Sequence, residues 1–256
     1  MDLVEVNFDI ENRHPWETAR LASVSRIIQK YAPNDKRLNF LDVGSGDAWV
    51  AHNFTEIFSN ANAYCVDIEY TQEVIEKINK GFNNKRLYLY DDLAKASPSG
   101  NNIDFVTLLD VIEHVPDDVW LLKEIKKNVY IKDETKFVIT VPAYNQLFSQ
   151  HDDLLKHYRR YNLDMLKDTI QKSGMNFIEG GYFYTSLLPP RALQLLKEKI
   201  KKEDLDDLTN LGKWNKGSFI TKCIHNVLLA DFKINQLVKK LGINLPGLSC
   251  YAVCSK

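Results

Sequence analysis

Short apolar runs alternate with amphipathic segments along most of the chain. Strands are predicted at 37–43, 62–68, 85–92, 101–111, 135–142, 176–184 and 247–256. The fourth run is nearly continuous in apolar residues, as in a strand covered on both faces. Helical spacing of apolar residues predicts helices at 17–31, 48–59, 72–81, 118–130 and 163–174. Strands that alternate with helices in this way are typical of a parallel sheet with helices on both faces.

Capping and turn residues mark the ends of several of these elements. Thr71 and Asn162 are placed to cap the helices that follow them. Gly81 is expected to end the third helix. The glycine pair at 180–181 indicates a bulge in the sixth strand.

Composition places the chain among ordinary globular proteins. Of its 256 residues 45% are hydrophobic and 26% are charged, and the formal net charge is −1. This charge gives the molecule as a whole no electrostatic reason to bind nucleic acid. The four cysteines are expected to be reduced thiols, and their spacing is unlike that of a zinc site. The spacing of His, Asp and Glu residues does not indicate metal ligands either, so no metal is expected. The mixed N-terminus and the lack of an uncharged apolar run of about 20 residues predict a cytoplasmic protein.

The segment NFLDVGSGDAW, residues 39–49, places two glycines and two acids directly after an apolar strand. Gly44 and Gly46 allow a sharp turn and a close approach of a ligand to the backbone. A dinucleotide-binding turn would carry a third small residue where Trp49 stands. Asp42 would repel a pyrophosphate and suits a cationic ligand group. The turn therefore favours a positively charged nucleoside over a dinucleotide.

With this turn, the chain resembles the class I S-adenosylmethionine-dependent methyltransferases, whose first motif is an acid followed by G-x-G. The resemblance covers residues 38 to about 145 and extends to the ends of the next three strands. It implies that Asp67 binds the ribose hydroxyls, and that Asp92, with Asp91 as a rival, binds the adenine amino group. The further cofactor-binding residues that it implies are Ser45, Ile68, Leu93, Leu109 and Asp110.

The chemistry of methyl transfer needs a positioned acceptor and, for a hydroxyl, a base near the ends of the fourth and fifth strands. His114, in IEHVP, follows the fourth strand, and FSQHDDLLKHYRRYN follows the fifth. His151 and His157 are the preferred base candidates. We call this segment, residues 148–162, the lid. In it, Tyr158, Arg159, Arg160 and Tyr161 are candidates for substrate contact. The alternative to substrate contact is that the charged residues of the segment form salt bridges that only hold the lid in place.

The lid segment is similar to a bacterial branch of these enzymes with HyRRY after the fifth strand. In that branch an N-terminal HWW…R segment corresponds to HPWETAR, although Pro15 and Glu17 depart from it. The resemblance implies that His14, Trp16 and Arg20 help to cover the site.

Residues 185–246 break the alternation of strands and helices. An apolar stripe at helical spacing runs from Phe219 to Leu241, and the run 197–207 alternates in charge as a solvated helix end does. We expect a cap over the sheet or a dimer interface. A helix resting on a membrane, which would admit a lipid-linked acceptor, is the alternative.

The resemblance implies a single Rossmann-like α/β domain over 1–256, with a seven-stranded, mostly parallel sheet whose last strand is antiparallel. Residues 1–35 would form a helical cover, 36–184 the cofactor-binding core and lid, 185–246 the cap and 247–256 the final strand. The implied function is methyl transfer from S-adenosylmethionine to an oxygen, or a nitrogen, of a small, glycan-linked or lipid-linked acceptor. S-adenosylhomocysteine would be the product, and the enzyme a monomer or homodimer. A nucleotide-dependent oxidoreductase and a non-catalytic cofactor-binding scaffold are the alternatives.

Overall fold

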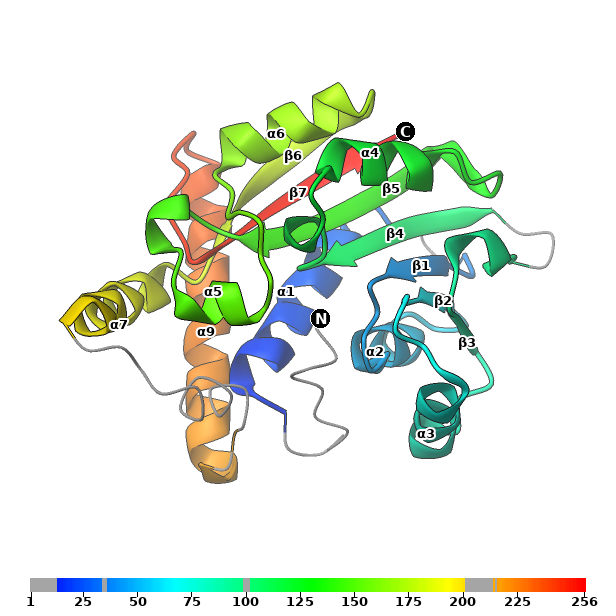
Figure 1. Cartoon of the computed structure of the whole chain (residues 1–256), viewed down its shortest axis with the longest axis horizontal. Coiled ribbons are helices and arrows are strands. Elements are labelled where there is room, and N and C mark those ends of the chain that lie inside the picture. Colours follow the sequence, from blue (N-terminus) through cyan, green and yellow to red (C-terminus); the bar gives the residue numbers. More distant parts are fainter. Residues whose placement is uncertain (1–12, 34–35, 99–101, 201–213, 215) are drawn as a thin grey trace.

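The computed structural model describes residues 13–33, 36–98, 102–200, 214 and 216–256. Its centre is a seven-stranded sheet in the order β3-β2-β1-β4-β5-β7-β6 (Figure 1). The strands are β1 (Asn39–Val43), β2 (Asn62–Val66), β3 (Leu87–Tyr90), β4 (Ile103–Leu109), β5 (Ile131–Pro142), β6 (Asn176–Phe183) and β7 (Ser249–Ser255). Neighbours from β3 to β5 pair in parallel, and β7 pairs antiparallel with both β5 and β6. The predicted fold class is confirmed.

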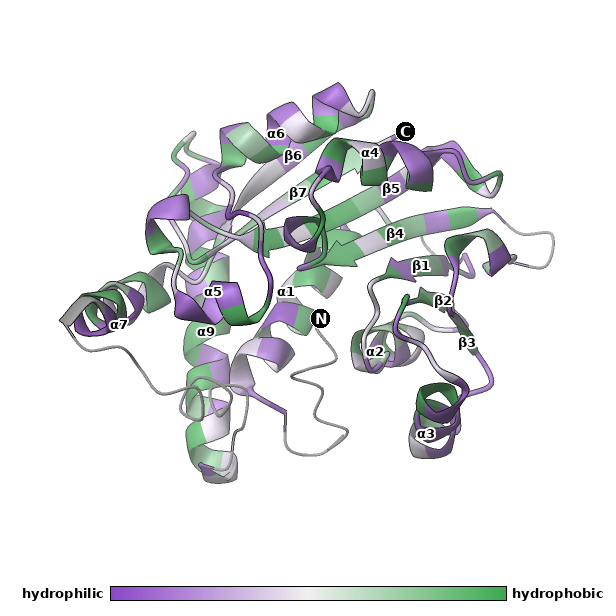
Figure 2. Cartoon of the chain, viewed as in Figure 1, coloured by the Kyte–Doolittle hydropathy of each residue, from purple (hydrophilic) through white to green (hydrophobic). Residues whose placement is uncertain are grey.

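Helices cover both faces of this sheet, as its nearly continuous apolar central strands require. The long helices are α1 (Pro15–Gln29), α2 (Trp49–Ile57), α3 (Gln72–Phe82), α4 (Asp118–Lys126), α6 (Leu163–Lys172), α7 (Leu188–Ile200) and α9 (Gly217–Lys239), with the short α5 at Gln150–Leu154. One core joins α1, α2, α3 and α9 to one face of the sheet, and a second core joins α4 and α6 to the other. Apolar residues accordingly follow the central strands β1, β4 and β5 (Figure 2).

Side chains of successive residues in a strand point alternately into the two cores. In β1, Phe40 packs into the first core and Leu41 into the second. The strands are therefore covered on both sides, which explains why β4 is nearly continuous in apolar residues.

Two expectations about glycines are wrong. Helix α3 does not end at Gly81 but continues to Phe82, because Asn83 takes the left-handed conformation that ends it, with φ 46°. The bulge in β6 lies between Phe177 and Glu179, before the glycine pair. A side chain at position 180 would meet Leu163 Cδ1 at 2.6 Å and the carbonyl of Tyr251 at 2.8 Å. These glycines therefore make room for neighbouring elements rather than for a bulge.

Helix α9 packs against α1 and β6 through Leu228 and Phe232, both buried. Other members of its apolar stripe point outward, among them Phe219, which is 79% exposed, and Leu237, which is 63% exposed. The N-terminal part of the predicted cover (1–12) and most of the charged run at 197–207 lie outside the described residues. No helix among the residues described is both long and apolar enough to cross a membrane.

Candidate active site

The order of the strands places the candidate site between the carboxyl ends of β1 and β4. The chain runs from β1 outward to β3 and then returns to β4 on the other side of β1, so the strand order reverses there. The glycine turn after β1 and residues 110–114 after β4 are therefore neighbours. A Cβ atom at position 44 would lie 2.7 Å from Cγ2 of Val111. Position 44 therefore needs glycine for two reasons: its φ of +68° is unfavourable for other residues, and a side chain there would collide with Val111.

The amino end of α2 is already capped by a carboxylate. Asp47 accepts a hydrogen bond from the backbone amide of Trp49 at 3.0 Å and forms an ion pair with Arg13. Arg13 also stacks over the ring of Trp49, 4.9 Å from its centroid. A pyrophosphate would need this helix end free of negative charge. The geometry therefore argues against the dinucleotide-dependent oxidoreductase.

Asp67 links the glycine turn to the end of β2. Its two carboxylate oxygens accept hydrogen bonds from the backbone amides of Gly46 at 2.8 Å and Glu69 at 3.0 Å. Ser45 in the same turn hydrogen-bonds to the hydroxyl of Tyr70 at 2.7 Å. Beside Asp67, Ile68 is 92% exposed, although it is a large apolar side chain. An exposed isoleucine in an otherwise rigid turn is suited to packing against an apolar ligand surface.

Asp42 lies beneath the turn, in β1, opposite Thr107 of β4. It is 3% exposed, and its carboxylate accepts a hydrogen bond from Thr107 Oγ1 at 2.5 Å. Burial raises the pKa of Asp42 to about 6, although the hydrogen bond and the positive charge of Arg20 oppose the shift. At neutral pH it is a buried anion for which the described residues provide no direct ion pair.

The two rival acids after β3 differ in what they already bind. Both oxygens of Asp91 accept hydrogen bonds from Lys95 Nζ, at 2.7 and 2.8 Å. Asp92 uses one oxygen to accept from the backbone amide of Ala94 at 2.8 Å, just before the short helix that starts at Leu93. Both side chains are exposed, but Asp92 has more hydrogen-bonding capacity left for a ligand.

At the end of β4, Asp110 is held by two side-chain contacts. It takes the left-handed conformation, with φ 58°, and its carboxylate accepts from Thr140 Oγ1 at 3.0 Å and forms an ion pair with Arg20. Arg20 is 2% exposed and stacks over Trp16, 4.4 Å from the ring centroid. The cover helix α1 thus reaches the strand end that follows Leu109. The ion pair between Arg20 and Asp110 could not be read from the sequence, because 90 residues separate the partners.

His14 and the two residues that depart from the family pattern build the start of α1. His14 accepts a hydrogen bond from the backbone amide of Trp16 through Nδ1 at 3.2 Å, and the carboxylate of Glu17 accepts from the amide of His14 at 3.1 Å. Pro15 takes the first helical position, where a missing N–H costs nothing. Burial lowers the pKa of His14 to about 4, so this ring is neutral at neutral pH. His14 therefore has a capping role in this structure.

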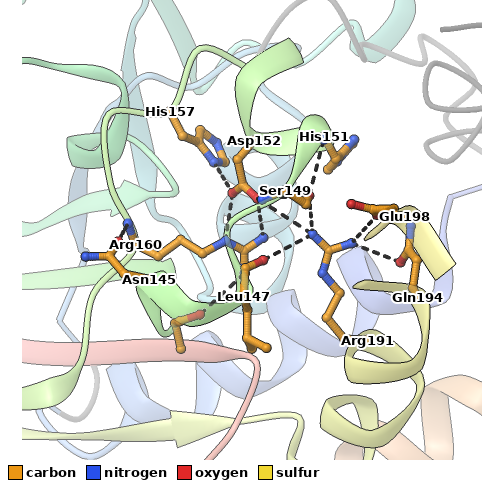
Figure 3. Close-up of polar contacts among 11 residues, drawn as sticks. Asn145, Leu147, Ser149, His151, Asp152, His157, Arg160, Arg191, Gln194 and Glu198 are labelled. Atoms are coloured by element: carbon orange, nitrogen blue, oxygen red, sulfur yellow. Dashed lines mark hydrogen bonds and ion pairs between the residues drawn. The ribbon is translucent and has the colours of Figure 1, made fainter. Parts of the chain in front are cut away.

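Beyond β5, the lid forms a network centred on Asp152 (Figure 3). Asp152 is fully buried and accepts two hydrogen bonds from Arg160, at 2.7 and 2.9 Å, and one from the backbone amide of Ser149 at 2.9 Å. His157 Nδ1 lies 2.8 Å from the same carboxylate, and Arg191 from α7 lies 3.6 Å away. Burial alone would raise the pKa of Asp152, but the hydrogen bonds from His157 and Arg160 outweigh it and hold the pKa below its ordinary value. Asp152 therefore stays ionised and fixes the lid.

This network bears on the predicted substrate contacts. The guanidinium of Arg160 is paired with Asp152, and Tyr161 is fully buried, with its hydroxyl donating to Asp118 at 2.6 Å. Arg159 forms an ion pair with Asp118 at 3.1 Å, whereas Tyr158 is 58% exposed. The geometry thus argues against contact between a substrate and Arg160 or Tyr161, because their polar groups are already used. Tyr158 remains open to solvent.

The three histidine candidates have different surroundings. Burial lowers the pKa of His151 to about 4, which makes it a weak base. His114 and His157 lie together, with ring centroids 4.6 Å apart in an edge-to-face arrangement. Glu113 joins them: ligand atoms of Glu113, His114 and His157 all lie within 4.8 Å of one another. No sequence pattern indicated this cluster, because His157 is distant in the chain from the Glu113–His114 pair.

A Rossmann-like sheet with a glycine turn after β1 and acids after β2 and β3 defines the class I methyltransferase fold. The methyltransferase-domain family model matches residues 16–180, which is more than half of the chain. The chain therefore belongs to this family and is an S-adenosylmethionine-dependent methyltransferase. The comparison with curated proteins gives no match.

Solved structures share the fold at low sequence identity. A Haemonchus contortus phosphoethanolamine N-methyltransferase 2, solved with phosphomonomethylethanolamine and S-adenosylhomocysteine, is 19% identical with a TM-score of 0.54, over 92% of this chain and 52% of its own. The plantazolicin methyltransferase BpumL, solved with S-adenosylhomocysteine, is 13% identical with a TM-score of 0.53, over 94% and 84%. The [4+2]-cyclase SpnF is 12% identical with a TM-score of 0.54, over 91% and 80%. These similarities define the fold, and the acceptor has to be inferred from the site.

Proposed function

We propose that this enzyme transfers the methyl group of S-adenosylmethionine to a hydroxyl oxygen of a small, glycan-linked or lipid-linked acceptor. The observation that carries the choice of oxygen is the cluster of Glu113, His114 and His157 beside the end of β4. A hydroxyl must lose its proton as it attacks, and this cluster supplies proton-accepting groups next to the cofactor-binding edge of the sheet. An enzyme that methylates a free amine has less need of such a base.

The cofactor would lie across the carboxyl ends of β1, β2, β3 and β4. Two features support this placement: Gly44 and Gly46 carry no side chain that would block a ligand at the turn, and the side chain of Ile68 is 92% exposed. Asp67 would bind the ribose hydroxyls, Ile68 and Leu93 would contact the adenine ring, and Asp92 would bind the adenine amino group. Arg20 pairs with Asp110 through Nη1, but its Nε has no hydrogen-bond partner among the described residues, so it would bind the carboxylate of the methionine portion. Asp42 would attract the positive charge of the sulfonium from beneath the turn.

The cofactor supplies a methyl group on a positively charged sulfur, from which an acceptor oxygen takes it in line, leaving the bonding electrons on sulfur. The chain has two tasks in this reaction. It must position the acceptor, for which Tyr158 is available, and it must take up the hydroxyl proton. His157 is suited to taking up the proton, because Asp152 lies 2.8 Å from its Nδ1 and fixes the ring. The other ring nitrogen, Nε2, is then the one that would accept the proton.

The test is a turnover assay that detects S-adenosylhomocysteine, run over a panel of phenolic, sugar and polyprenyl-linked alcohols with matching amines. A hydroxylated acceptor should be methylated, and His157→Ala should lower kcat while leaving cofactor affinity unchanged. His52→Ala is the matched control, since His52 lies on α2 and hydrogen-bonds to Asn84. Turnover of the amines alone would contradict oxygen transfer. Cofactor binding without turnover of any acceptor would favour the non-catalytic scaffold.

A further inference from the structure

The carboxylate of Glu113 is the least satisfied charged group beside the candidate site. Glu113 is fully buried, and neither of its oxygens accepts a hydrogen bond from another of the residues described. A buried carboxylate without a partner is costly, so proteins normally protonate it or pair it with a cation. The short helix after β4 nevertheless directs this group toward two histidines. The arrangement indicates that something binds between them.

The donor atoms in this cluster match a known ligand set. Two imidazoles and one carboxylate are the ligands of many divalent transition-metal sites, where they occupy part of the coordination sphere and leave other positions open. The ligand atoms of Glu113, His114 and His157 lie within 4.8 Å of one another, a spacing that one ion can bridge with small side-chain movements. The nearby acids, by contrast, are already paired: Asp110 with Arg20, and Asp152 with Arg160.

The surroundings of His157 support the same interpretation. A histidine that binds a metal through one ring nitrogen usually donates a hydrogen bond from the other to a carboxylate, which fixes the tautomer and the ring orientation. Asp152 provides that carboxylate at 2.8 Å from Nδ1, and Arg160 and the amide of Ser149 hold it in place. The lid thus presents Nε2 of His157 as an acceptor of a cation.

We propose that Glu113, His114 and His157 bind a divalent transition-metal ion, with Zn²⁺ as the probe, and that an open position on the ion takes the acceptor oxygen. The second part deepens the proposed function and rests on it. With the ion bound, Nε2 of His157 is a ligand and no longer the proton acceptor; a hydroxyl bound to the ion instead loses its proton to water more readily, because the ion stabilises the oxygen anion. The anion then forms the O–CH₃ bond while the S–CH₃ bond breaks, with the electron pair remaining on sulfur. The binding of metal itself does not depend on methyl transfer.

The experiment is a calorimetric titration of the full-length, chelator-treated protein with Zn²⁺, with Co²⁺ absorption as a second readout of the ligand set. The wild type should bind one Zn²⁺ ion per chain and gain thermal stability from it. Glu113→Gln and His157→Ala should each weaken Zn²⁺ binding by about 100-fold or more. His52→Ala, which removes a histidine from α2, should bind Zn²⁺ like the wild type.

Two measurements, of cofactor affinity and of turnover with hydroxylated acceptors, keep this result separate from the proposed function. Cofactor affinity is measured by calorimetry on the same proteins without metal. Failure of the wild type to bind either ion, or binding that survives in both Glu113→Gln and His157→Ala, overturns the metal site, even if the cofactor binds normally. Metal binding by a protein that methylates no hydroxyl would overturn the proposed oxygen transfer and leave the metal site standing. His114→Ala replaces Glu113→Gln if circular dichroism shows the latter to be misfolded.

Discussion

The two parts of the sheet's carboxyl edge are built in opposite ways. At the ends of β1, β2 and β3, backbone turns and single hydrogen bonds leave groups such as Ile68 and Asp92 exposed. Beyond β5, the charged centre of the lid is buried and its charges are paired around Asp152. The first region can therefore take up a ligand without losing internal contacts. The second is a rigid support whose strong charges are mostly used for holding the lid.

The largest effect is expected where the lid network is broken. Asp152→Asn removes the buried anion and leaves Arg160 without its partner, which should lower the free energy of unfolding by about 3–5 kcal/mol. Urea denaturation measures this change. Asp153→Asn is the matched control, because Asp153 is the exposed neighbour in the same helix and should change stability little. Equal stabilities of the two variants would mean that the network does not hold the lid.

In the cofactor region, Asp67→Ala should weaken binding of S-adenosylmethionine by about 1–3 kcal/mol, the scale of a lost charged hydrogen bond. Isothermal titration calorimetry measures this loss. Glu73→Ala serves as the control, because Glu73 is an exposed acid on α3 that pairs only with Lys77 among the described residues. Unchanged affinity in a folded Asp67→Ala protein would remove Asp67 from the binding site.

Asp42 gives the cofactor region a pH dependence. With a pKa of about 6, it becomes neutral as the pH falls from 7 to 5. If its charge attracts the cofactor, affinity should fall by about tenfold over that interval, and Asp42→Asn should lack this step. Stability should change in the opposite direction. Because the pKa of the folded state lies above the ordinary value of 3.8, the stabilising contribution of this group is complete below that value and is lost as the pH rises through 6. Affinity and stability that rise together with pH, through this group, would contradict the assignment.

The smallest effect is expected at Ile68. Ile68→Ser should weaken cofactor binding by about 1 kcal/mol, since only part of the side chain would be covered by the ligand. Stability should be unchanged, because the side chain is 92% exposed. Val129→Ser, at a residue 71% exposed and remote from the turn, is the control for calorimetry. A loss of stability without a loss of affinity would place Ile68 in the fold and not in the site.

The fold could be predicted well because its signals are local. Short apolar runs defined the strands, and Thr71 and Asn162 cap helices as expected, accepting hydrogen bonds from the amides of Val74 and Met165. Helix ends were less accurate: Asn83, which also tolerates a left-handed conformation, took the role expected of Gly81. Strand β5 begins at Ile131, earlier than predicted, because it pairs there with Ile103.

The site residues that directly follow strand ends could be predicted from the sequence. The contacts between residues far apart in the chain could not. The acids and glycines after β1, β2 and β3 stand at fixed offsets from apolar runs, so the sequence places them at one edge. The pairing of Arg20 with Asp110, and the meeting of Glu113 with His157, depend on how α1 and the lid pack. No periodicity encodes these contacts. The sequence therefore indicated His114 and His157 among three candidate bases, without the carboxylate of Glu113 that joins these two.

The position of β7 between β5 and β6 has a consequence for how such an enzyme can diversify. The chain leaves the sheet after Phe183 and re-enters it at Ser249, which pairs with Phe183 itself. The stretch between these two residues thus starts and ends at one place in the sheet, although its helix α9 also packs against α1 and β6. Its length and sequence can be exchanged between relatives without shifting any strand pairing. Exchanging this segment between homologues and assaying the chimaeras for acceptor preference is accordingly a direct test of whether it contributes to acceptor choice.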